Sequence, residues 1–153
     1  MNEQGQLGVG DTVDRYKPTE IVQLSNLKIK EIFCGDTHCF SLTEIGNLYG
    51  WGCNAYGQLG IGHKIPQKQP TLISKDLKIN QICSGFGFSI LVTNSGILVS
   101  GRNENGQLGL GDKIDRIRFT KNKFLENKEI LKIATKGHHS IALSSKKIFL
   151  MEI

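Results

Sequence analysis

Short apolar segments alternate with turn residues along most of the chain. Residues 29–35, 39–44 and 47–52 are rich in β-branched and aromatic side chains and are bounded by Gly, Asn or Asp, which is typical of β-strands. Residues 45–47 (Ile-Gly-Asn) and 94–96 (Asn-Ser-Gly) each separate two apolar runs, as tight hairpin turns do. No window keeps helical periodicity over three turns, so the pattern predicts a chain of short strands.

The strand pattern repeats with a period of about 50 residues, which is the signature of stacked supersecondary units. The tetrapeptide Gly-Gln-Leu-Gly begins at residues 5, 57 and 106, so it recurs after 52 and then 49 residues. An Asn stands three residues before each copy, and an apolar residue and a Gly follow it, so the motifs span residues 2–11, 54–63 and 103–112. We interpret their central residues as structural, with Leu inside the unit, Gly at positive φ and Gln bonded to backbone: Gly5, Gln6, Leu7, Gly8, Gly57, Gln58, Leu59, Gly60, Gly106, Gln107, Leu108 and Gly109.

A second marker, placed in the strands, keeps the same step. His38, Phe88 and His139 each precede a small residue and an apolar stretch. About four short strands in a unit of about fifty residues make one β-propeller blade, and a blade buries both faces of its sheet only when neighbours stack on it. The sequence therefore predicts an all-β fold in which residues 1–153 form a single array of about three propeller blades.

Composition agrees with a turn-rich globular chain. Gly accounts for 18 of the 153 residues and Pro for 3, and a Gly excess without Pro indicates tight turns rather than disorder. No apolar run reaches the length of a membrane helix, and the first residues show no secretory signal. We therefore expect a cytoplasmic or nuclear protein with no membrane span.

The net charge of +5 arises in the last third of the chain. Residues 1–100 hold eight basic and eight acidic side chains, whereas residues 101–153 hold eleven and six. Alternation along a strand predicts that Arg116 and Arg118 point outward together, while Ile117 and Phe119 point inward. Five basic residues are candidate contacts for an anionic partner such as nucleic acid, chromatin, phospholipid or acidic protein, the alternative being a solvated blade edge: Lys113, Arg116, Arg118, Lys121 and Lys123.

The remaining polar residues do not assemble a reactive site. The four cysteines lack the Cys-x-x-Cys spacing of zinc sites, and without a secretory signal we do not expect a disulfide framework. Cys34 and Cys39 align through the repeat with Ser and Thr residues, which favours packed thiols over a nucleophile. The Gly-rich motifs lack the Lys-Ser/Thr of a phosphate loop. We therefore expect no catalytic residues, no metal and no cofactor.

Three segments carry a resemblance to a known family. Residues 35–38 (Gly-Asp-Thr-His), 51–54 (Trp-Gly-Cys-Asn) and 57–62 (Gly-Gln-Leu-Gly-Ile-Gly) resemble, nearly in full, the repeat of the regulator of chromosome condensation family. The resemblance covers almost the whole chain and implies blades of a seven-bladed propeller. It also implies a structural role for Trp51, and for His38 and His139 in pinning neighbouring backbone.

The chain departs from the family pattern at a few positions. Phe88 replaces the His of the second unit, and the Trp position of that unit is expected to be lost because residues 98–103 are one residue shorter than residues 48–54. Three units are fewer than half of seven, so we expect a piece of a longer propeller whose open blade edges self-associate.

The expected function is a protein-interaction scaffold, since rigid blades present loops on two faces. The alternative implied by the resemblance is guanine nucleotide exchange on a Ran-like small GTPase, with chromatin association. A third possibility is anchoring to chromatin or a membrane through the basic residues. The expected partner is therefore a protein, with a small GTPase and nucleic acid or chromatin as further candidates.

Overall fold

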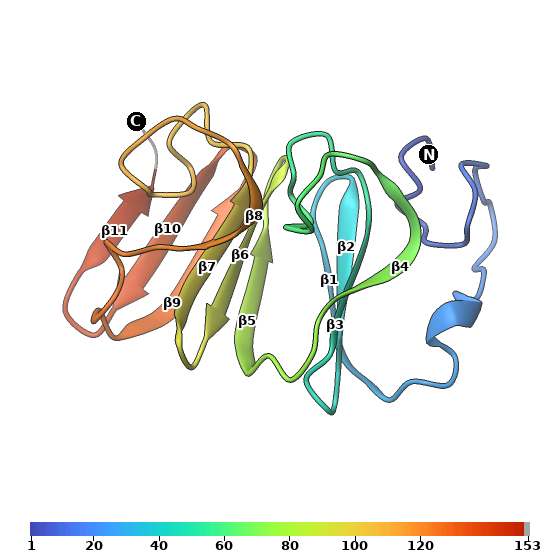
Figure 1. Ribbon diagram of the computed structural model, residues 1–153, viewed down its shortest axis with the longest axis horizontal. Coiled ribbons are helices and arrows are strands. Elements are labelled where there is room, and N and C mark those ends of the chain that lie inside the picture. Colours follow the sequence, from blue (N-terminus) through green and yellow to red (C-terminus); the bar gives the residue numbers. More distant parts are fainter. Residues whose placement is uncertain (152–153) are drawn as a thin grey trace.

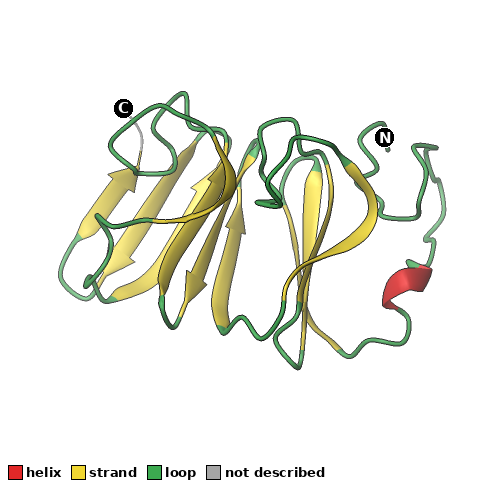
Figure 2. Ribbon diagram, viewed as in Figure 1, coloured by secondary structure: helices red, strands yellow, loops and turns green. Residues whose placement is uncertain are grey.

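The computed structural model describes residues 1–151, which form eleven strands in three antiparallel sheets and a single turn of 3-10 helix (Figures 1 and 2). The first sheet contains β1 (Ile29–Cys34), β2 (His38–Thr43), β3 (Leu48–Gly52) and β4 (Gln67–Ser74). The second contains β5 (Ile79–Ser84), β6 (Phe88–Thr93), β7 (Gly96–Gly101) and β8 (Arg116–Lys121). The third contains β9 (Ile130–Lys136), β10 (His139–Ser144) and β11 (Ile148–Met151), and the 3-10 turn η1 spans Val22–Leu24.

Each sheet is a meander of neighbouring strands, in agreement with the predicted blades. Gly46, with φ of 85°, turns the chain between β2 and β3, a backbone conformation that favours glycine. The chain leaves the third strand of a blade, passes through a motif and returns as the fourth strand. β4 thus follows the motif at 54–63, and β8 follows the motif at 103–112. The three sheets stand side by side along the molecule (Figure 1). This confirms the all-β propeller fold; the last two residues of the predicted array, 152–153, lie outside the described part.

Two apolar layers hold the sheets together. Leu59 lies between the first and second sheets and Leu108 between the second and third, and both side chains are fully buried. Fully burying a Leu side chain contributes roughly 1.5–3 kcal/mol, so each motif Leu stabilises an inter-blade contact. Leu7 has only the first sheet beside it and is half-buried. The first layer is completed by Phe40, Leu42, Leu48, Ile79, Ile82 and Leu91, and the second by Cys83, Phe88, Ile90, Ile97, Val99, Leu125, Ile133, Ala142 and Met151.

The outward face of the third sheet is apolar and open. Ile141 on β10 occupies the position of Phe40 and Ile90 in the preceding sheets, where both are fully buried by the next blade. Ile141 itself is 41% exposed, and Ile148 and Leu150 of β11 are more exposed still. This sheet therefore presents the surface that a further blade covers elsewhere in the array.

Candidate interaction site: the motif loops and the basic segment

Each motif is fixed by the same hydrogen bonds. The side-chain oxygen of its Asn accepts from the backbone N–H of its Leu, at 2.9 Å for Asn2 and Asn103 and 3.0 Å for Asn54. The side-chain oxygen of its Gln accepts from the N–H two residues earlier, at 3.0 Å in all three motifs. The Asn and Gln side chains therefore take the place of strand pairing and hold the loop in one conformation.

The carbonyl of each motif Gln ties the loop to the following blade. In the second sheet the hydroxyls of Ser89 and Ser100 donate to the Gln58 carbonyl at 2.8 and 3.1 Å. In the first sheet the Trp51 indole N–H donates to the Gln6 carbonyl at 3.0 Å. Trp51 pairs across the sheet with Cys39, and Ser100 pairs in the same way with Ser89.

The Trp position of the second unit is therefore retained and holds Ser100. The expected deletion was wrong, because the matching segment begins at Ile97 rather than Leu98, and residues 97–103 are as long as residues 48–54.

His38 joins the first two blades. Its Nε2 lies 2.9 Å from Ser89 Oγ, and its side chain is fully buried. The Ser89 hydroxyl has a single hydrogen, which it donates to the Gln58 carbonyl. His38 Nε2 therefore carries a hydrogen and donates it to Ser89 Oγ. Burial lowers the pKa of His38 to about 4, since a buried imidazolium loses its hydration. Phe88 fills the equivalent place in the second sheet, and His139 in the third is exposed.

The cysteines differ in their surroundings. Cys83 is buried, and its thiol donates a hydrogen bond to the Ile133 carbonyl at 3.1 Å, as a packed thiol does. Cys34 is exposed, so the expectation of a packed thiol was wrong at that position.

Three equivalent loops present an exposed aliphatic side chain just after each motif. Val13, Ile65 and Ile114 are 61%, 66% and 66% exposed, and they recur with the same steps as the motifs. The backbone N–H of each donates to a side chain two residues earlier, namely to Asp11 at 2.9 Å, His63 at 3.2 Å and Asp112 at 2.9 Å. The motifs lie at one end of the blades, which we call the motif end (Figure 1).

Two carboxylates stabilise these loops. The backbone N–H of Val13, followed by the Arg15 side chain, lowers the pKa of Asp11 below its usual value. Arg116, followed by the N–H of Ile114, does the same for Asp112. The loops are therefore rigid, and their aliphatic tips face solvent. These tips were not predicted from the sequence, although their common spacing was the available signal.

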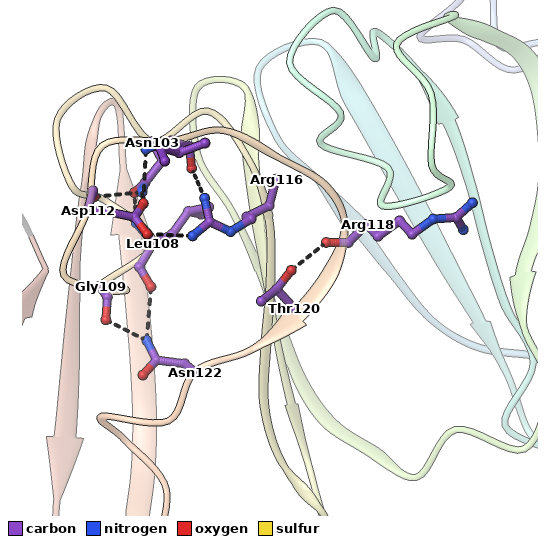
Figure 3. Close-up of polar contacts among 9 residues, drawn as sticks. Asn103, Leu108, Gly109, Asp112, Arg116, Arg118, Thr120 and Asn122 are labelled. Carbon is purple, nitrogen blue, oxygen red and sulfur yellow. Dashed lines mark hydrogen bonds and ion pairs between the residues drawn. The ribbon is translucent and has the colours of Figure 1, made fainter.

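The basic segment does not form one surface. Arg116 turns back onto its own loop and pairs with Asp112 at 2.5 Å, while Arg118 extends in a different direction (Figure 3), with its guanidinium against Gly62. Lys121 pairs with Glu126 and thereby lowers the pKa of that carboxyl. Lys113 and Lys123 are exposed.

The predicted alternation along β8 was therefore wrong in part. Phe119 packs on the apolar layer as expected, but Ile117 is 40% exposed. The cause is a bulge: Gly101 pairs with Arg116 and Val99 with Thr120, so β8 holds two more residues than β7 between these pairs.

Within residues 1–151 no group of three or more His, Cys, Asp or Glu side chains is placed to hold a metal ion. The same part of the chain contains no helix with the length and apolar character needed to cross a membrane. A hollow of about 410 Å³ lies between the first two blades at the end opposite the motifs, next to Glu44, Asp76 and Lys78.

The family model for the regulator of chromosome condensation (RCC1) repeat matches residues 1–42, 46–92 and 96–143. The chain belongs to the RCC1 repeat family. It is 36% identical over 147 residues to the ultraviolet-B receptor UVR8 of Arabidopsis thaliana, which covers 94% of this chain and 33% of UVR8. The RCC1 array described here thus spans about a third of that relative.

Solved structures show the same fold. Human WBSCR16 superposes on 98% of this chain and 40% of its own with a TM-score of 0.77 at 22% identity. Prp20p from Saccharomyces cerevisiae, whose binding properties to Gsp1p and histones were described with its structure, covers 95% of this chain and 38% of its own. Its TM-score is 0.66 at 23% identity. These similarities confirm the propeller blades expected from the sequence.

Proposed function

We propose that this RCC1 array is a protein-interaction scaffold that binds its partner at the motif end of the blades. The observation that carries the proposal is the row formed by Val13, Ile65 and Ile114, one exposed aliphatic side chain on each of three equivalent loops. Exposed apolar side chains are ordinary when scattered singly. Here they recur at one position of a rigid repeat, so a partner that fits one blade fits the next.

The loops lose little conformational entropy when a partner binds to their exposed side chains. The Asn, Gln and Asp side chains already fix the backbone, so binding loses little further conformational freedom. Charged side chains of both signs stand beside the tips, and Arg15 pairs with Asp11 and Lys64 with Asp115. We therefore propose a protein partner that contributes apolar side chains, and that is met in the cytoplasm or nucleus. No catalytic role is assigned to this array.

A site-specific photo-crosslinker tests this assignment. Benzoylphenylalanine replaces Ile65 at the motif end or, as the control, Ile45, which is 71% exposed in the β2–β3 turn at the other end. We expect a discrete cross-linked protein from residue 65 and none from residue 45. Cross-linking of the same protein from residue 45 alone would place the partner at the opposite end and contradict the proposal.

The second candidate is nucleotide exchange on a Ran-like GTPase with chromatin binding. It is favoured by the reported binding of Prp20p to Gsp1p and histones, and by Arg118 and Lys123, which are exposed on β8 and just after it. Release of labelled GDP from a purified Ran-like GTPase measures this activity. An increase over the spontaneous rate supports exchange, and an unchanged rate leaves the scaffold as the function of this array.

A further inference from the structure

The hairpin of β1 and β2 brings two thiols together. Cys34 is the last residue of β1, Cys39 lies directly opposite it on β2, and their sulfur atoms are 3.2 Å apart. The Gly35 N–H donates to the His38 carbonyl at 2.8 Å, so Gly35 and His38 form the hydrogen-bonded pair and the two cysteines the next, non-hydrogen-bonded pair. Cys34 is exposed, so reagents in solvent reach this pair.

The other two blades show that the fold does not need thiols here. The equivalent cross-strand pairs are Ser84 with Ser89 in the second sheet and Thr135 with Ser140 in the third. The hydroxyls of Ser89 and Ser140 each donate to a motif Gln carbonyl at 2.8 Å. The Cys39 sulfur lies 3.6 Å from the Gln6 carbonyl, and its one hydrogen is donated to the Cys34 sulfur at 3.2 Å instead, so the matching contact is weaker. Hydroxyls thus serve the packing better, and the paired thiols add chemistry that the other blades lack.

We propose that Cys34 and Cys39 form a redox-reactive dithiol that closes reversibly into a disulfide within the first blade. Residues at a non-hydrogen-bonded antiparallel pair have Cα atoms about 4.5 Å apart, which lies within the range that disulfides span. The two sulfur atoms need to approach by only about 1 Å to reach the S–S bond length of about 2.05 Å. The strands therefore need no rearrangement.

Cys34 is the attacking thiol. It is the more exposed of the two, and the hydrogen bond that the Cys39 thiol donates to its sulfur lowers the pKa of Cys34 to about 6. The same hydrogen bond raises the pKa of Cys39, which keeps its proton until Cys34 has reacted. Such an asymmetry suits a nucleophilic thiol with a resolving neighbour.

With oxidised glutathione the reaction has two steps. The Cys34 thiolate attacks one glutathione sulfur, so a mixed disulfide forms and the first glutathione thiolate leaves. Cys39 then loses its proton to solvent and attacks the Cys34 sulfur, which expels the second glutathione thiolate. Two protein thiols are oxidised to one disulfide, and one glutathione disulfide is reduced to two glutathione thiols, which take up the two protons that Cys34 and Cys39 released.

The other cysteines supply the controls. The Cys53 N–H donates to the Thr37 carbonyl at 2.8 Å, so Cys53 stands close to the same hairpin and is the competing thiol. Cys83 is buried between the second and third sheets. Serine already fills the equivalent strand positions at 84 and 89, so Cys34→Ser and Cys39→Ser are expected to keep the fold, which circular dichroism checks.

The test equilibrates the purified chain in glutathione buffers of increasing oxidised fraction, traps free thiols with N-ethylmaleimide and counts adducts by intact mass. We expect the wild-type chain to lose two adducts together, with peptide mapping joining Cys34 to Cys39. Cys53→Ser should still lose two, and Cys39→Ser should stop at one bound glutathione on Cys34. The proposal is overturned if the wild-type chain keeps four adducts in fully oxidised buffer, if the disulfide maps to Cys53, or if Cys34→Ser still loses two adducts.

Discussion

His38 in the first blade donates a hydrogen bond from Nε2 to Ser89 Oγ in the second, across 2.9 Å, and both side chains are fully buried. The Ser89 hydroxyl donates its own hydrogen bond to the Gln58 carbonyl. A chain of two hydrogen bonds therefore links β2, β6 and the motif loop at 54–63. Protonation of His38 would bury a charge and add a hydrogen to Nδ1, which has no hydrogen-bond partner within residues 1–151. The contact between these two blades therefore depends on the protonation state of His38.

Acid should weaken folding through His38. The unfolded chain binds a proton at His38 below pH of about 6.5, whereas the folded chain, whose His38 pKa is about 4, does not. Stability from this group is thus fully present above pH 6.5, falls as the pH drops and levels off below pH 4, a total of about 3 kcal/mol. Urea unfolding at several pH values measures it.

The control for this prediction comes from the second blade. His38→Phe places there the residue that Phe88 already provides at the equivalent strand position. The variant cannot take up the proton, so its stability should depend less on pH between 4 and 6.5 than that of the wild-type chain. If the stability of both proteins changes with pH in the same way, His38 is protonated equally in the folded and unfolded states, and the prediction is wrong.

The motif leucines should differ in their importance. Leu59→Ala removes a fully buried side chain between two sheets, and such changes cost about 2–5 kcal/mol. Leu7→Ala should cost less, because Leu7 is half-buried beside one sheet. Thermal unfolding compares both with Lys64→Ala, a surface control. Equal melting temperatures for Leu59→Ala and Lys64→Ala would rule out a stabilising role for Leu59 between the first two sheets.

The isolated array should self-associate through its third sheet. Ile141, Leu143, Ile148 and Leu150 are all at least 41% exposed on β10 and β11, on the face that a following blade covers in the other sheets. Sedimentation velocity over a wide concentration range should show a concentration-dependent increase in mass. Leu143→Lys with Leu150→Lys should suppress it, and a wild-type chain that stays monomeric throughout would refute the expectation.

Binding to polyanions should depend on Arg118 and Lys123 rather than on Arg116. Arg116 is held by Asp112, whereas Arg118 and Lys123 are exposed. If the segment binds DNA, Arg118→Glu with Lys123→Glu should reduce the affinity and flatten its dependence on salt, since fewer counterions are released. Lys146→Glu with Lys147→Glu, in the β10–β11 turn, is the charge-matched control. If the two double variants bind DNA equally, Arg118 and Lys123 are not the contact.

The sequence predicted the blades because each local signal is repeated. The spacing of the motifs identified Leu59 and Leu108, whose burial follows from their place between two sheets. The common direction of Arg116 and Arg118 and the inward position of Ile117 were predicted wrongly, because the bulge in β8 depends on pairing with β7 and leaves no mark in the sequence of β8 itself. The contact between Cys34 and Cys39 depends on hairpin register in the same way. Side-chain direction next to a bulge or turn is therefore the part that required the structure.

The most direct test of the scaffold is the affinity of the array for the protein cross-linked from residue 65. Val13→Ser, Ile65→Ser and Ile114→Ser combined remove the aliphatic row without touching a buried residue, and Ile45→Ser at the opposite end is the control. Binding measured by calorimetry should weaken at least about tenfold for the triple variant, since each buried methylene contributes about 0.8 kcal/mol. The control should bind as the wild-type chain does. Unchanged affinity of a folded triple variant would contradict the account.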